Sequence, residues 1–159
     1  MGLHHHENTK IARLHGMKMF EHSSKKALEH LAAAADEVIA PAGTVLFQEG
    51  HRYHEAYIIS EGIAEMTVHG DKLVEIDAGH VVGELAMLEH SAATGTVVCK
   101  TDVHALAIPH NRFDEILHEN PELTLVIAKQ LADRVLLQDP HIDDLRFPDL
   151  NDEGVPHYH

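Results

Sequence analysis

Basic residues are scarce in this sequence, and the shortage excludes several partners. Lys and Arg number 12 against 26 Asp and Glu, which gives a formal net charge of −14. Lys25 and Lys26 form the largest basic cluster. Because phosphate backbones and anionic lipids are bound by clustered Lys and Arg, we expect neither nucleic acid nor a membrane surface as a partner.

Cysteine, tryptophan and long apolar runs are scarce or absent. The single cysteine, Cys99, allows no internal disulfide and is typical of a reducing compartment. No apolar run approaches the roughly 20 residues of a membrane-spanning helix, and the first ten residues lack the apolar region of a signal peptide. We therefore expect a cytoplasmic protein. With no Trp, four Phe and three Tyr, its core must be largely aliphatic.

Histidine is abundant, with 17 residues. Histidines cluster at both ends of the sequence, as His4, His5 and His6 and as the final His-Tyr-His, and such clusters are typical of metal-binding sites. No His pair combines helical spacing with a third ligand and an orienting carboxylate, so we expect no metal site. Exposed His residues that give the acidic surface a pH response are the favoured interpretation, and a haem or metal sensor is the alternative.

The length of 159 residues suits one domain with a substantial core. A weak helical pattern covers residues 8–20, and Ser23 or Ser24 is expected to cap a second helix. From Asp36 the pattern changes to short β-rich runs separated by Gly43, Gly50 and Gly62, with further runs at 72–82, 95–100 and 103–109. Short strands at this spacing predict an antiparallel sandwich or barrel.

The helical period returns after Pro109, with a short helix at 111–119 and a long one from Pro121. The long helix has two apolar stripes, one of Leu123, Ile127, Leu131 and Val135 and the other of Leu125, Ala128, Ala132 and Leu136. Two stripes predict two packing partners, the β-domain and a second subunit; the alternative buries both within one chain. We expect a flexible N-terminus (1–7), a domain (8–138) and an acidic irregular tail (139–159).

Three segments then carry a family resemblance. "APAGTVLFQEG" (40–50), "AYIISEGIAEM" (56–66) and "DAGHVVGELAML" (77–88) resemble, in order and spacing, the cyclic-nucleotide-binding domains of the catabolite activator protein and of protein kinase A regulatory subunits. The resemblance extends from about Leu14 to Gln138. It implies a mainly β fold: an eight-stranded antiparallel, jelly-roll-like β-roll with N-terminal helices and a long C-terminal helix that often pairs subunits.

The resemblance also implies a ligand site, the phosphate-binding cassette of that family. Gly83 matches its tight-turn glycine, which lets backbone approach a ligand. Glu84 matches the carboxylate that accepts a hydrogen bond from the ribose 2′-hydroxyl. Leu85 and Ala86 match the start of a short helix whose free N–H groups face the cyclic phosphate.

The cassette departs from the family at its arginine. The matching position carries Ala93, followed by Thr94, so the guanidinium that neutralises the phosphate is missing. Losing one partner of a buried charged pair costs roughly 2–5 kcal/mol. The Thr94 hydroxyl or a protonated His80 or His90 could compensate only in part.

Two functions follow from this departure. The first is a stand-alone regulatory module without a DNA-binding domain, in which cyclic AMP or another small ligand binds weakly, differently or not at all. The helix at 122–138 would then carry the response and pair subunits in a homodimer. The alternative is a dimeric scaffold that binds no ligand. About 20 residues follow the long helix, too few for a helix-turn-helix domain, so we expect no transcription regulator.

No catalytic residues are expected. Cys99 falls in a predicted strand, where a small core residue is its simplest role, and Ser60 and Glu61 fall at a predicted turn. Nothing in the sequence assembles a nucleophile, a base and an oxyanion donor.

Overall fold

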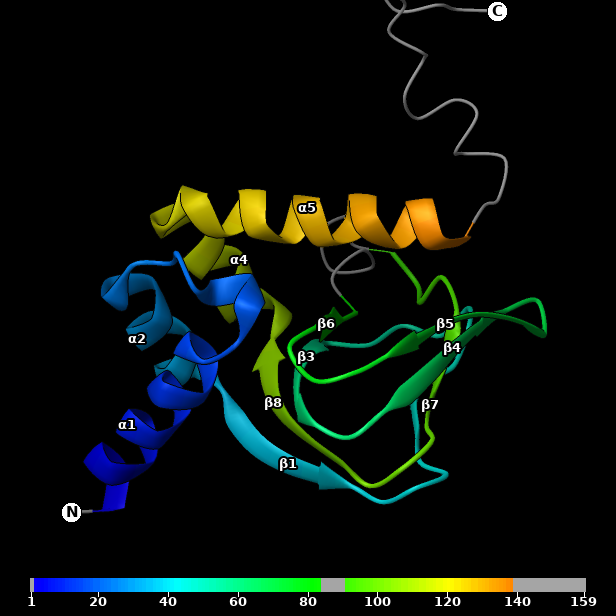
Figure 1. The fold of residues 1–159 in the computed structure, drawn as a ribbon, viewed down its shortest axis with the longest axis horizontal. Helices are drawn as coiled ribbons and strands as arrows, with labels where there is room; N and C mark the ends of the chain where they lie inside the picture. The colour runs from blue at the N-terminus through cyan, green and yellow to red at the C-terminus, as the bar shows by residue number, and fades with distance from the viewer. Residues whose placement is uncertain (1, 84–90, 139–159) are drawn as a thin grey trace, which may run out of the picture.

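The fold is a β-roll flanked by helices, described by a computed structural model for residues 2–83 and 91–138. Three helical elements come first: α1 (Gly2–His15), the 3-10 turn η1 (Lys18–Phe20) and α2 (Lys25–Ala34). Helices α4 (His110–Glu119) and α5 (Pro121–Gln138) follow the strands. Figure 1 shows α5 lying along one side of the roll, with α2 and α4 together near its first residues.

Within the described residues, eight strands build two four-stranded sheets, and every pair is antiparallel. One sheet has the order β1-β8-β3-β6 and the other β2-β7-β4-β5. The strands are β1 (Asp36–Ala40), β2 (Val45–Phe47), β3 (Glu55–Glu61), β4 (Ala64–Val68), β5 (Asp71–Ile76), β6 (Val81–Val82), β7 (Thr96–Cys99) and β8 (Val103–Pro109). This arrangement confirms the antiparallel β-roll with flanking helices.

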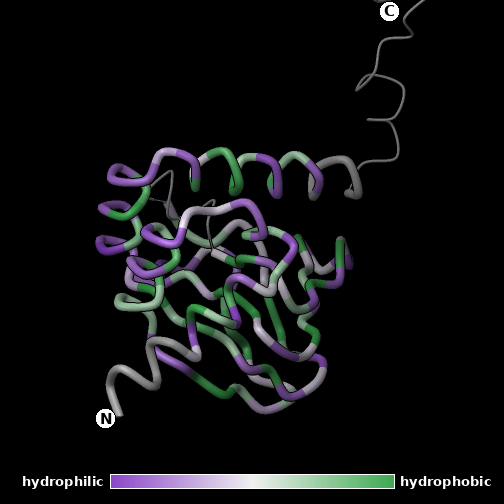
Figure 2. The backbone as a smooth tube through the Cα atoms, turned by 60° about the vertical axis from the view of Figure 1, so that its left-hand side comes forward, coloured by the Kyte–Doolittle hydropathy of each residue, from purple (hydrophilic) through white to green (hydrophobic). Residues whose placement is uncertain are grey.

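In the part of the chain that the structure describes, buried apolar side chains form two cores. One lies between the helices and the first sheet and includes Phe20, Leu28, Leu106 and Phe113. The other fills the roll itself and includes Phe47, Ile59, Val97 and Cys99. In Figure 2, hydrophobic stretches follow the strands, while hydrophobic and hydrophilic residues alternate along α5.

The helix ends are fixed by specific residues. Ser24 caps α2, because its Oγ accepts a hydrogen bond from the Ala27 N–H (3.1 Å), and the same Oγ donates to Glu122 of α5 (3.0 Å). Asn120, buried between α4 and α5, donates its side-chain amide to the Ile116 carbonyl (2.9 Å). Pro121 begins α5, as the sequence predicts.

Helix α1 extends from Gly2, through most of the segment expected to be flexible. The tail expected at 139–159 lies outside the described residues. In the part of the chain that the structure describes, no helix is long and apolar enough to span a membrane.

Candidate ligand site

Gly83 lies directly after β6, where the cassette is expected to begin. Its φ is +90°, a conformation that residues with a Cβ rarely adopt. A Cβ at this position would stand 2.6 Å from Cζ of Phe47. The residue must therefore be glycine for two reasons, and the group that approaches its backbone in this structure is the ring of Phe47.

Three of the expected site residues, Glu84, Leu85 and Ala86, lie outside the described residues, as does His90. The structure resumes at Ser91, so Gly83 and the segment 91–95 frame the cassette from its two ends.

Ala93 stands at the position matched to the arginine, and its side chain is buried in the roll. It is 8% exposed and belongs to the same apolar cluster as Phe47 and Val97. Its N–H donates to the His51 carbonyl (2.8 Å), and its carbonyl accepts from the Gly50 N–H (2.9 Å). The loop between β2 and β3 thus holds this backbone in place by a short antiparallel pairing.

The residues after Ala93 lead into strand β7. Thr94 is exposed. Gly95 precedes β7, outside the strand in which the sequence suggests it, and a Cβ there would stand 2.8 Å from the Thr67 carbonyl oxygen. Thr96 begins β7, and its Oγ1 accepts from the Glu49 N–H (3.1 Å). This segment is tightly packed from Ala93 into the strand.

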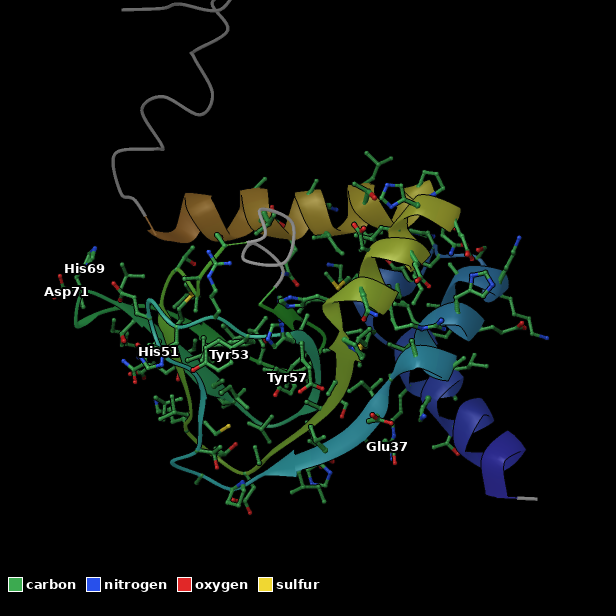
Figure 3. All side chains as sticks on the ribbon, turned by 180° about the vertical axis from the view of Figure 1, so that it is seen from behind. Glu37, His51, Tyr53, Tyr57, His69 and Asp71 are labelled. Atoms are coloured by element: carbon green, nitrogen blue, oxygen red, sulfur yellow. The ribbon has the colours of Figure 1, made fainter. Side chains whose placement is uncertain are left out.

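Three aromatic rings gather beside Gly83, a feature that sequence reasoning missed. Phe47 makes edge-to-face contacts with Tyr53 and Tyr57, at centroid distances of 4.9 and 5.5 Å. The Tyr53 hydroxyl accepts from the Gln48 N–H (2.8 Å). Burial raises the pKa of Tyr57, with smaller contributions from Glu55, Tyr53 and Cys99. Figure 3 shows Tyr53 and Tyr57 within the roll, whereas His69 and Asp71 lie at a hairpin tip.

The described charges near this site are few. The His51 carbonyl accepts the hydrogen bond from the Ala93 N–H. Arg52, which is exposed, directly follows His51, so it is the basic residue nearest in sequence to this hydrogen bond. His80, considered as a compensating donor, pairs with Asp77 (Nδ1 to Oδ1, 2.9 Å). Among the described residues, no group of three or more His, Cys, Asp or Glu could hold a metal ion.

Helix α5 is fastened to the strand that leads into the cassette. Gln130 is 7% exposed. Its Oε1 accepts from the Val81 N–H (2.7 Å), and its Nε2 donates to the Val81 carbonyl (3.0 Å). Val81 begins β6 and lies two residues before Gly83. A movement of α5 would therefore distort its two hydrogen bonds to the strand that leads into the cassette.

Known proteins share this fold and sequence pattern. The family model described as "cyclic nucleotide-binding domain" matches residues 37–120. A lysophospholipase from Neurospora crassa is 30% identical over 138 residues, which is 84% of this chain and 9% of that protein. A cyclic nucleotide-gated potassium channel from Rhizobium etli is 28% identical over 73% of this chain and 32% of the channel.

Solved structures agree. The regulatory domain of Toxoplasma gondii protein kinase A, crystallised with cAMP, superposes with a TM-score of 0.72 at 15% identity, covering 81% of this chain and 51% of that one. The regulatory subunit of a cAMP-independent protein kinase A from Trypanosoma brucei superposes with a TM-score of 0.70 at 23% identity. The match covers 89% of this chain and 49% of that one. This chain spans less than a tenth of the lysophospholipase and about a third of the channel. The chain belongs to the cyclic nucleotide-binding domain family.

Proposed function

We propose that this chain is a regulatory module whose ligand site has lost its phosphate-neutralising charge, so that it binds cyclic nucleotides weakly, in an altered way or not at all. The observation that carries the proposal is Ala93. This residue occupies the matched arginine position with a methyl group buried in an apolar cluster. The functional unit is the domain at 8–138.

Charge explains the expected loss. A cyclic phosphate that leaves water needs a fixed cation or several donors, and a guanidinium supplies both in a planar fork. Without it, affinity falls by about 30-fold to several-thousand-fold, the equivalent of roughly 2–5 kcal/mol. The net charge of −14 makes the approach of an anion less favourable still.

The relatives support both outcomes as possibilities for one fold. The Toxoplasma gondii domain is described with cAMP, whereas the Trypanosoma brucei subunit is described as cAMP-independent. A ligand with less charge than a cyclic nucleotide would suit the aromatic and apolar surroundings of Gly83. The relatives' lysophospholipase activity is not transferred, since only a small share of that protein matches, and we propose no catalytic role.

The second candidate function, a dimeric scaffold, is favoured by the outer stripe of α5. Ala128 and Ala132 of this stripe are both exposed and lie outside the residues packed against the domain. The inner stripe, in contrast, buries Leu123 and Ile127 against the domain. An apolar stripe that no described part of the chain covers suits a second subunit, so we propose a homodimer that pairs through 122–138.

Calorimetric titration of the full chain with cyclic AMP, cyclic GMP and adenosine tests the proposal. We expect no cyclic nucleotide to bind more tightly than about 10 µM. Tighter binding would overturn the proposed loss, and the Arg52→Ala variant would then show whether Arg52 replaces the missing guanidinium. Binding of adenosine alone would support an altered, less charged ligand.

A further inference from the structure

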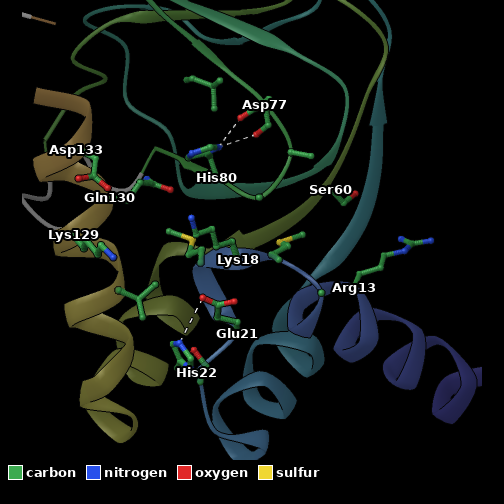
Figure 4. Close-up of a pocket in the computed structure, with 18 of the residues that line it drawn as sticks. Arg13, Lys18, Glu21, His22, Ser60, Asp77, His80, Lys129, Gln130 and Asp133 are labelled. Carbon is green, nitrogen blue, oxygen red and sulfur yellow. Dashed lines mark hydrogen bonds and ion pairs between the residues drawn. The ribbon is translucent and has the colours of Figure 1, made fainter. Parts of the chain in front are cut away.

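A groove runs along α5. It has a volume of about 1210 Å³ and lies between α5, the end of α1 with η1, and the turn that joins β5 to β6. Figure 4 shows Lys129, Gln130 and Asp133 on the α5 side, Asp77 and His80 on the turn, and Lys18 and Glu21 on the N-terminal side. Its main walls thus come from three regions of the chain, and Ser60, Glu61 and His104 of β3 and β8 complete the lining.

The α5 wall has the length and spacing of a helix-binding surface. The lining residues Glu122, Leu125, Val126, Lys129, Gln130 and Asp133 recur three and four apart, so they form one face of the helix. At 1.5 Å per residue, this face extends for about 16 Å, or three helical turns.

The floor of the groove is apolar and adaptable. Leu125 is the most exposed large apolar side chain among the described residues, and Val126, Val74 and Met19 are partly exposed beside it. Methionine has a flexible, polarizable side chain that fits irregular apolar partners. The amide of Gln130 occupies the N–H and carbonyl of Val81, so the β6 backbone in this groove does not offer those groups to an added strand. A helix fits this surface better than a strand does.

The rim of the groove is acidic, and this charge decides between occupants. The lining contains three cations, Arg13, Lys18 and Lys129, and six carboxylates, Glu21, Glu61, Glu75, Asp77, Glu122 and Asp133. The formal charge is thus −3 with His neutral. The chain's own tail at 139–159 has six acidic residues and one Arg, and a second copy would bring the same acidic rim to this groove. Like charge disfavours both as occupants.

We propose that this groove is the docking site for a basic amphipathic helix of a partner protein. The apolar face of that helix lies on Leu125, Val126 and Met19, and its Lys and Arg side chains reach the carboxylates of the rim. The proposal does not require the cassette to bind a ligand.

The test uses the full chain and a fluorescent amphipathic peptide of about 18 residues with a leucine face and a lysine face. We expect the peptide to bind, and binding to weaken between about 0.05 M and about 0.5 M salt. A matched peptide with glutamate in place of lysine is expected not to bind. Failure of the lysine peptide to bind would overturn the proposal.

Two triple variants separate the groove from general charge. Glu21→Gln, Asp77→Asn and Asp133→Asn remove one carboxylate from each wall, and we expect them together to weaken binding about tenfold. Glu29→Gln, Asp114→Asn and Glu115→Gln remove the same charge from exposed positions of α2 and α4 outside the lining. These control changes are expected to alter binding by less than about twofold. Equal losses in both triples would overturn the proposal.

The other occupants give distinct results. A synthetic peptide of residues 139–159 that displaces the lysine peptide would identify the tail as the occupant. A change in oligomeric state caused by the groove variant, and not by the control variant, would identify a second copy. Either result would overturn the proposal.

Discussion

Both the backbone conformation and the packing at Gly83 require glycine. Gly83→Ala must hold a Cβ at a φ of +90° and place it 2.6 Å from the Phe47 ring. The conformational cost is roughly 1–2 kcal/mol, and the overpacking costs about 1–3 kcal/mol more. Gly79→Ala is the matched control, because its φ of +92° is equally strained but its Cβ would meet only Met17 at 4.0 Å. Chemical denaturation should show a larger loss of unfolding free energy for Gly83→Ala than for Gly79→Ala. Equal losses would mean that the Phe47 ring moves aside without an energetic cost.

Two weakly acidic side chains, the buried Cys99 thiol and the half-buried Tyr57 phenol, should make the protein less stable in alkali. Burial raises the pKa of the Cys99 thiol and of the Tyr57 phenol. The folded state therefore keeps protons that the unfolded state loses, starting near pH 8.5 for cysteine, about the pKa of an unperturbed thiol. The free energy of unfolding falls as pH rises from there through the raised pKa, by at most about 1.4 kcal/mol per pH unit for each group.

Cys99→Ala tests this linkage. We expect the variant to have a flatter decline of unfolding free energy between about pH 8.5 and pH 10, while a constant cavity loss affects every pH equally. Urea denaturation at several pH values measures the slope. An unchanged slope would show that Cys99 does not contribute.

Among the elements, α5 depends on one amide for its position over β6. Gln130→Leu keeps a similar volume and leaves the Val81 N–H and carbonyl without these two bonds. Each of the two hydrogen bonds contributes about 0.5–1.5 kcal/mol, so we expect a destabilisation of about 1–3 kcal/mol. The exposed neighbour on the same helix provides the control, Lys129→Leu, which should cost less than about 0.5 kcal/mol. Hydrogen exchange of the Val81 amide should accelerate in the first variant only; protection in both would contradict the proposed fastening.

The sequence predicts most elements because their signals are local. Short β-rich runs between glycines gave the strands, Ser24 proved to be the cap of α2, and Pro121 begins α5. The ring of Phe47 over Gly83, the amide of Gln130 on Val81 and the groove along α5 escaped prediction, because each joins residues far apart in the chain. For the cassette itself, Glu84, Leu85 and Ala86 stay predictions, and so do the roles given to Ala93 and Thr94.

For the molecule as a whole, the outer stripe of α5 sets the expected assembly. Ala128→Glu with Ala132→Glu places two charges on this exposed stripe, and we expect these changes to convert a dimer into monomers. Asn111→Glu on the exposed surface of α4 should leave the dimer intact. Sedimentation velocity distinguishes the two states, and a wild-type chain that sediments as a monomer would contradict the proposed pairing.

The central claim is that a cyclic nucleotide-binding fold has lost the charge that holds phosphate, and restoring that charge tests it most directly. Calorimetric titration with cyclic AMP would compare the wild type with Ala93→Arg and with Thr94→Arg, which adds the same charge at an exposed position. Thermal denaturation would establish that each variant is folded. We expect Ala93→Arg to gain at least about 30-fold in affinity, and Thr94→Arg to gain little. A folded Ala93→Arg variant that binds no better than the wild type would contradict the account.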